Sequence, residues 1–247
     1  MHFYNRFTAA HPLVLSSIYA WTSAHLFYSK TLGSLDTAFL YHRKCLDQIS
    51  LQHEIQTPEA WNAESEGHLT AAISKLSKDS LDSVIVAFYF LASFDLMASQ
   101  ARELRKILRL VSLLIKIRGC TSDAGGIFLR VSTWFCFLDA RESAFGQGTC
   151  PILNAIGGED GIVQAMQASR HFLQEEYSIL YPAEELQKDE AHAPLLAMIL
   201  RLVATFSDIS THYEGSNNTV RDEIRERLNG YAEVGISSLF PYESNDK

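Results

Sequence analysis

Apolar residues recur every three to four positions along most of the chain, and this spacing predicts amphipathic α-helices. The predicted helices cover about residues 12–28, 34–49, 57–76, 81–97, 102–118, 126–146, 160–181, 192–213 and 219–230. Short polar loops separate them, for example over 120–125 and 146–157, and no segment has the alternation of a strand. We therefore predict one all-α domain of eight to ten helices over residues 1–240, followed by a frayed tail over 241–247.

Local capping signals predict where several helices begin. Pro12 suits the first position of the first helix, and Ser34 suits the N-cap of the second. Thr57-Pro58-Glu59 has the cap, proline and acidic first turn of a third helix start. Asp79 is predicted to cap the fourth helix, and Pro194 to lie in the first turn of the long helix near the C-terminus.

The most apolar predicted helix ends in the sequence VSTWFCFLDARESAFGQG, residues 131–148. Its apolar side chains cover several faces: Ile127, Val131, Trp134, Phe135 and Leu138 on one, and Phe128, Cys136 and Phe137 on others. A helix that is apolar all round is surrounded by other helices. Asp139 and Arg141 are two residues apart and do not face each other, so each should pair with another helix or a loop backbone. We predict a central structural helix and its exit rather than a catalytic turn.

The predicted helix RELRKILRLVSLLIKIR, residues 102–118, combines an apolar stripe with six basic residues and one acidic residue. One interpretation is a contact surface for an acidic partner helix or nucleic acid, made by Arg102, Arg105, Lys106 and Arg109. The other is an ordinary amphipathic helix whose basic face is solvated. We favour the second interpretation.

Motifs with recognisable chemistry are missing from the sequence. It contains no paired E-x-x-H, H-E-x-x-H, P-loop, G-x-G-x-x-G or G-x-S-x-G motif. The helical terpene cyclases need a D-D-x-x-D stretch, which is absent, and Phe206 occupies the first ligand position of their second metal motif. Gly125-Gly126 suits either an anion-binding helix start or a flexible turn, and we favour the turn. We predict no catalytic residue, metal ligand or cofactor, and no enzyme.

Composition narrows the function classes further. The chain has 247 residues and a net charge of −8, so it should repel nucleic acid as a whole. Its four cysteines form no C-x-x-C pair and suggest free thiols in a reducing compartment, with Cys45 and Cys136 buried. The N-terminus does not resemble a signal peptide, and the most apolar run, 84–94, is too short to span a bilayer. We expect a soluble, intracellular protein without a membrane partner.

Three segments carry a family resemblance. They are His11-Pro12 followed by LVLSSIYAWTSAHL, YHRKCLDQI over residues 41–49, and LRVSTWFCFLDARESAFGQG over residues 129–148. In order and spacing they resemble the fungal-specific transcription factor domain, the helical middle region of fungal zinc binuclear-cluster regulators. The resemblance covers about residues 11–150 well and the rest loosely. Its signature positions here are His11, Pro12, Trp134, Leu138, Asp139 and Arg141.

The resemblance implies a nuclear regulatory domain that acts by packing against a protein partner, a second copy or a small effector. Regulators of this family bind DNA through a six-cysteine cluster that holds two zinc ions. The four widely spaced cysteines of this chain do not form that module, so the resemblance implies no direct DNA binding here. The alternative function is a standalone helical scaffold or small-molecule-binding module without a role in transcription.

Overall fold

The computed structural model describes residues 8, 10–31, 33–56, 62–119, 125–145, 151–177, 183–212 and 222–230. The regular structure of these residues is entirely helical, which confirms the predicted all-α class. The helices are α2 (Pro12–Tyr28), α3 (Leu35–His53), α4 (Ala63–Ser74), α5 (Lys78–Met97), α6 (Ala101–Arg118), α7 (Gly126–Phe145), α8 (Pro151–Ile156), α9 (Gly158–Tyr177) and α10 (Ala183–His212), with a further helical segment over residues 222–230.

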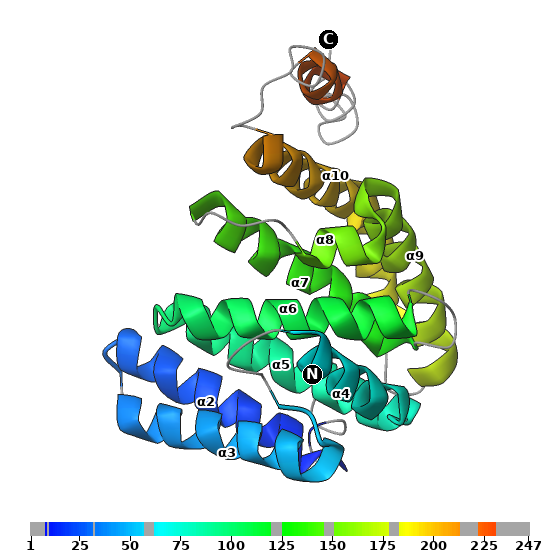
Figure 1. Ribbon diagram of the computed structural model, residues 1–247. Helices are drawn as coiled ribbons and strands as arrows, with labels where there is room; N and C mark the ends of the chain where they lie inside the picture. The colour runs from blue at the N-terminus through cyan, green and yellow to red at the C-terminus, as the bar shows by residue number, and fades with distance from the viewer. Residues whose placement is uncertain are drawn as a thin grey trace.

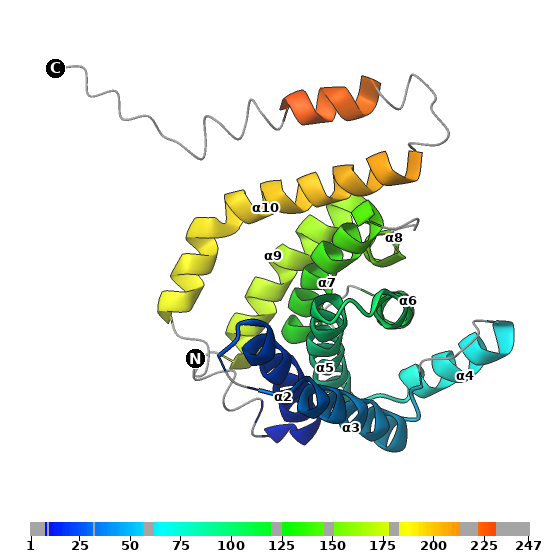
Figure 2. The same cartoon turned by 90° about the vertical axis from the view of Figure 1, so that its left-hand side faces the viewer.

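The helices pack in an order that broadly follows the chain (Figure 1). α2 lies against α3 and α5, and α5 also lies against α6 and α7. α7 packs on α9 and α10, while the short α8 rests against α6. α4 lies at the periphery, where its packing contacts are with α6 (Figure 2). The helices α5, α6 and α7 therefore form the centre of the fold.

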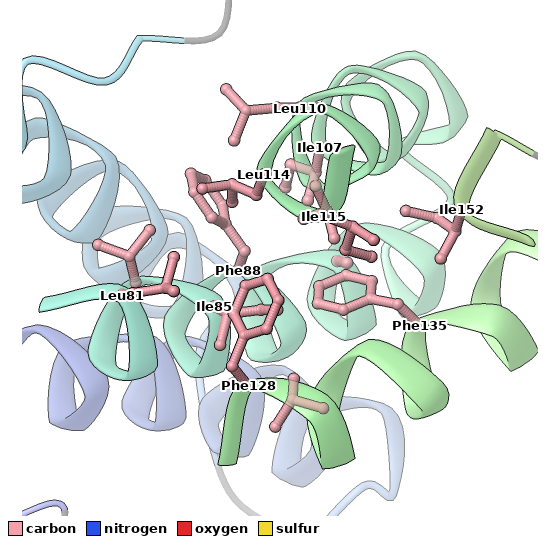
Figure 3. Packing of buried hydrophobic residues seen from close by; sticks show 14 of the residues in the cluster. Leu81, Ile85, Phe88, Ile107, Leu110, Leu114, Ile115, Phe128, Phe135 and Ile152 are labelled. Atoms are coloured by element: carbon pink, nitrogen blue, oxygen red, sulfur yellow. The ribbon is translucent and has the colours of Figure 1, made fainter. Parts of the chain in front are cut away.

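The main hydrophobic core lies where these three helices meet (Figure 3). Phe88 of α5 and Phe128 and Phe135 of α7 are at most 1% exposed, and they pack with aliphatic residues of α6. The predicted apolar stripe of α6 is buried along its whole length, at Leu104, Leu108, Val111 and Ile115. Burying side chains of this size is the main stabilising contribution to such a fold.

The central position of α7 is confirmed. Its first eight residues, 126–133, are all buried, and they include Arg130. The Arg130 Nε donates a hydrogen bond to the Ser169 Oγ of α9 at 2.9 Å, so this charge has a polar partner within the core. Buried charges are tolerated when such partners are present.

Two predicted helix starts are confirmed, and one predicted cap is wrong. Pro12 is the first residue of α2, and the Ser34 side chain caps α3 by accepting from the Thr37 N–H. α4 begins at Ala63 with a capping box on Asn62, and the start predicted at Thr57-Pro58-Glu59 lies outside the described residues. The cap of α5 is Ser77, and the predicted cap, Asp79, lies in the first turn instead.

The second half of the chain differs more from the prediction. The expected loop over 146–157 contains α8, which at six residues is too short to show a helical period. α10 begins at Ala183, so Pro194 lies inside the helix rather than in its first turn. A proline removes one backbone hydrogen bond and bends a helix, and Figure 2 shows α10 bending. The predicted boundaries at Gly146, Pro182 and Thr219 and the tail 241–247 lie outside the described residues.

α5 extends the apolar run 84–94 on both sides, and the whole helix is long and apolar enough to cross a membrane by length and composition. However, 67% of the most apolar 18-residue stretch of this helix is buried inside the fold. It also carries the buried carboxylates Asp82 and Asp95. These features are those of the core helix of a helical domain.

Candidate functional site

Three aspartates lie buried in the central helices. Asp82 and Asp95 of α5 and Asp139 of α7 are only 1–2% exposed. Removing a carboxylate from water is costly unless donors replace the lost hydration. The hydrogen-bond donors around each aspartate therefore show which carboxylates have a structural role and which one lacks donors.

Asp82 holds the start of α7. Its Oδ1 accepts a hydrogen bond from the Phe128 N–H at 3.2 Å, in the first turn of that helix. Gly125 has a φ of +86°, and a side chain on Gly126 would meet the backbone nitrogen of Leu173 at 2.7 Å. The Gly125-Gly126 turn thus begins a helix whose N-terminus is already occupied by a carboxylate of the chain. The Gly125-Gly126 turn therefore fits neither of the two interpretations fully, the anion-binding site for a ligand or the flexible turn.

Asp139 holds the start of α8 in the same way. Its Oδ2 accepts from the Ile152 N–H at 2.8 Å and from the Leu153 N–H at 3.3 Å. This confirms the expected partner, the backbone of another segment. Burial raises the pKa of Asp139 to about 7, and the two backbone donors act in the opposite direction. Asp139 is therefore a cap that joins α7 to α8, and the exposed Arg141 is not part of it.

The other signature residues are not gathered into one site. The His11 Nε2 lies 3.4 Å from the Asp79 Oδ1, which connects the start of α2 to the first turn of α5. Pro12 begins α2, whereas Trp134 and Leu138 are half-buried on α7 at the edge of the core. The signature therefore marks helix starts and core packing at separate places in the fold.

The basic face of α6 carries carboxylate partners from three helices. Arg105 pairs with Glu142 at 2.6 Å, Lys106 with Glu103 at 3.3 Å, and Arg109 with Glu66 at 3.2 Å. Arg102 is exposed in the first turn. These pairs reduce the positive charge available to an outside partner.

The two described cysteines, Cys45 and Cys136, are free and buried, as predicted. Burial raises the pKa of the Cys45 thiol to about 12, so this thiol stays protonated and unreactive at neutral pH. Cys120 and Cys150 lie outside the described residues.

A pocket of about 640 Å³ opens between α3, the end of α5 and the start of α6. Its acidic lining residues are Asp36, Asp47, Asp95 and Glu103. The apolar lining comes from one face of α3, at Phe39, Leu40 and Leu46, and the same helix adds His42 and Arg43. The volume lies within the range of small-molecule sites.

Asp95 lines this pocket, and its hydrogen bonding differs from that of the other two aspartates. Its Oδ1 lies 3.0 Å from the His42 Nε2, but the two groups are not aligned as a hydrogen bond, and Oδ2 has no donor. His42 packs on the Phe94 ring, with 4.7 Å between ring centres. Burial raises the pKa of Asp95, and the neighbouring His42 opposes this rise. Asp95 thus remains short of donors at the edge of an open pocket.

Neither Asp95 nor His42 was predicted from the sequence to be a site residue. Asp95 directly follows the apolar run 84–94, and His42 lies inside the segment YHRKCLDQI that carries the resemblance. The signal in the sequence that could have indicated Asp95 is a carboxylate on a helix that is otherwise apolar. Its partner, 53 residues earlier, becomes visible only when α3 and α5 are placed together.

These features define an all-helical domain in which two buried aspartates, Asp82 and Asp139, cap neighbouring helices. Within the described ranges, no three His, Cys, Asp or Glu side chains are grouped so that they could hold a metal ion. The fungal specific transcription factor domain matches the chain over residues 4–227. The chain therefore belongs to this family of transcription regulators, which is not an enzyme family and implies a nuclear location. No curated protein and no solved structure matches the chain.

Proposed function

We propose that this chain is a regulatory domain that alters transcription through reversible contact with a partner at the pocket beside α3. The observation that carries the proposal is the family match over residues 4–227. The pocket supports the mode of action, because it is open and contains a carboxylate without hydrogen-bond donors. A ligand regulates a domain only if it binds one state of the domain more tightly than another. Buried groups with unmet hydrogen bonds supply such a difference in affinity, because binding can provide the missing bonds.

The exposed faces of α2 and α3 also suit a contact with a protein or a second copy. Large apolar side chains are exposed on the two N-terminal helices: Tyr19, Phe27 and Tyr28 on α2, and Phe39 and Leu40 on α3. Exposed aromatic groups are enriched where proteins associate. A partner that lies on α3 would cover the pocket and its rim at the same time.

A tethered reporter assay tests the proposal. The chain is joined to an unrelated DNA-binding module and expressed in yeast nuclei with a matching reporter gene. We expect reporter activity to differ from that of the module alone. Leu40→Glu should reduce this difference, because Leu40 is 66% exposed and lines the pocket. Leu51→Glu is the matched control on the same helix, since Leu51 is 84% exposed and lies outside the pocket lining.

The alternative, a helical scaffold or binding module without a transcriptional role, makes the opposite prediction. Both the unchanged chain and its variants would then leave the reporter at the level of the module alone. Protein abundance measured by immunoblot ensures that a silent reporter reflects function rather than loss of the chain.

A further inference from the structure

We infer that the pocket between α3 and α5 takes a small organic cation, an amine with an apolar body, as its regulatory ligand. This inference rests on the proposed function, because it names the class of ligand for the same site. It uses three observations: the charge of the lining, the unmet acceptors of Asp95, and an apolar face of matching size.

The lining has an excess of negative charge. Asp36, Asp47, Asp95 and Glu103 contribute four carboxylates, against the single permanent cation Arg43. Glu103 already has a partner in Lys106, at 3.3 Å. Asp36 and Asp47 are exposed and have no ion-pair partner within the described part of the chain. An anion would be repelled by this lining, whereas a cation would be attracted.

Asp95 supplies a specific acceptor rather than a diffuse field. Its side chain is 1% exposed, and neither of its oxygens accepts an aligned hydrogen bond. An ammonium group has three donors and no acceptor, which suits carboxylate oxygens that lack donors. His42 lines the same pocket and lies 3.0 Å from Oδ1 of Asp95, but Oδ2 has no donor.

The apolar part of the ligand has a defined place. Phe39, Leu40 and Leu46 lie on the face of α3 that carries Asp36 and Asp47, because positions three and four apart share a helix face. Phe39 is 38% exposed and Leu40 is 66% exposed, so both remain accessible. Covering them removes apolar surface from water and adds to the charge interaction. A metal ion alone would leave this surface unused.

The test compares probes of similar size that differ in charge. Phenethylammonium, phenethyl alcohol and hydrocinnamate are cationic, neutral and anionic versions of one aromatic body. Binding to the full chain is followed by protein-observed NMR. We expect phenethylammonium to bind with a Kd on the order of 1 mM, as suits a probe of this size, and to perturb resonances of the pocket residues. The neutral probe should bind at least about tenfold more weakly, and the anion should show no binding.

Variants locate the effect. Asp95→Asn should weaken the binding of phenethylammonium by about tenfold or more, because it removes the charge from the acceptor. The double variant Asp36→Asn/Asp47→Asn changes only exposed groups, so it tests the site even if Asp95→Asn does not fold. It should weaken binding severalfold and reduce the preference for the cation. Asp160→Asn, an exposed acid in the first turn of α9, is the matched control and should change nothing.

Several outcomes would overturn the inference. Equal binding of the alcohol and the ammonium, preference for the anion, or no binding of any probe at millimolar concentration each excludes an organic cation as the ligand class. Tighter binding of Nα-acetyl-lysine amide than of phenethylammonium would assign the pocket to a lysine side chain of a protein. The reporter assay is independent of these results, so failure of the ligand class leaves the transcriptional role to be judged by its own experiment.

Discussion

Asp139 combines a buried carboxylate with two backbone donors, and these have opposite effects on its protonation. Its pKa in the fold is about 7, above the ordinary value of 3.8, because burial dominates. The fold therefore favours the neutral acid. Its contribution to stability is complete below pH ~4 and is lost as the pH rises through ~7. Asp95 acts in the same direction, because burial raises its pKa too.

We predict that the free energy of unfolding falls between pH ~4 and ~7, with Asp139 contributing up to about 4 kcal/mol. Asp139→Asn should flatten this fall, because an amide accepts the same N–H groups without ionising. Asp139→Ala should lose the cap and lower the free energy of unfolding by about 1–3 kcal/mol at pH ~5. Urea unfolding across the pH range measures all three proteins. Parallel curves for the unchanged chain and Asp139→Asn would show that Asp139 does not titrate in this range.

Two glycines make a second pair of residue-scale tests. A Cβ on Gly126 would lie 2.7 Å from the backbone nitrogen of Leu173, whereas one on Gly67 of α4 would meet no atom within 4 Å. We predict that Gly126→Ala lowers the free energy of unfolding by about 1–3 kcal/mol, since backbone must shift. Gly67→Ala should raise it by about 0.5–1 kcal/mol, since alanine favours an exposed helix position. Denaturant melts decide, and an unchanged midpoint for Gly126→Ala would contradict the close packing of α7 on α9.

Single helices in this fold depend on residues from their neighbours. α8 has six residues, and its first turn is capped by Asp139 of α7. The end of α4 is held by Arg118 of α6, whose guanidinium donates to the Ile73 and Leu76 carbonyl oxygens. Isolated helices as short as these two are marginal in water, so their formation is tied to tertiary packing.

Among the helices, α7 should lose the most stability when a buried side chain is shortened. Phe135 is fully buried against α5 and α6, so Phe135→Ala should lower the free energy of unfolding by about 3–5 kcal/mol. Leu138 is only half-buried, so Leu138→Ala should cost about 2 kcal/mol, the low end for such a change. Lys116→Ala, on the exposed face of α6, should change it by less than about 0.5 kcal/mol.

The same denaturant melts compare these three variants. If Phe135→Ala and Lys116→Ala unfold at the same midpoint, α7 is not the core helix described above. If Leu138→Ala costs as much as Phe135→Ala, the exit of α7 is more tightly packed than its exposure indicates.

For the whole molecule, net charge governs what the chain binds non-specifically. The charge is −8, and the basic face of α6 is matched by Glu66, Glu103 and Glu142. We predict no salt-sensitive affinity of the chain alone for duplex DNA, because there is no surplus of positive charge to release counterions. Fluorescence anisotropy of a labelled duplex, at low and at physiological salt, measures this. Tight binding that weakens steeply with added salt would contradict the prediction.

The sequence by itself determined the class of the fold, the main helices and the family. Three features were recognised from neighbouring residues alone: the periodicity of α6, the proline at the start of α2 and the apolar surface of α7. Such local patterns are present in the sequence whatever the tertiary structure. The same patterns failed at α8, which is too short to show a period, and at Pro194, where packing of α10 outweighs the local preference.

Only the tertiary structure decided which carboxylates cap helices and which one lines a pocket. Asp82, Asp95 and Asp139 look alike as acidic residues in apolar helices. They differ because the backbone of α7 reaches Asp82 and that of α8 reaches Asp139, whereas Asp95 lies beside a histidine and has no backbone donor. Hydrogen-bond partners act over about 3 Å, and the fold brings them together from positions far apart in the chain, so no local pattern contains this information.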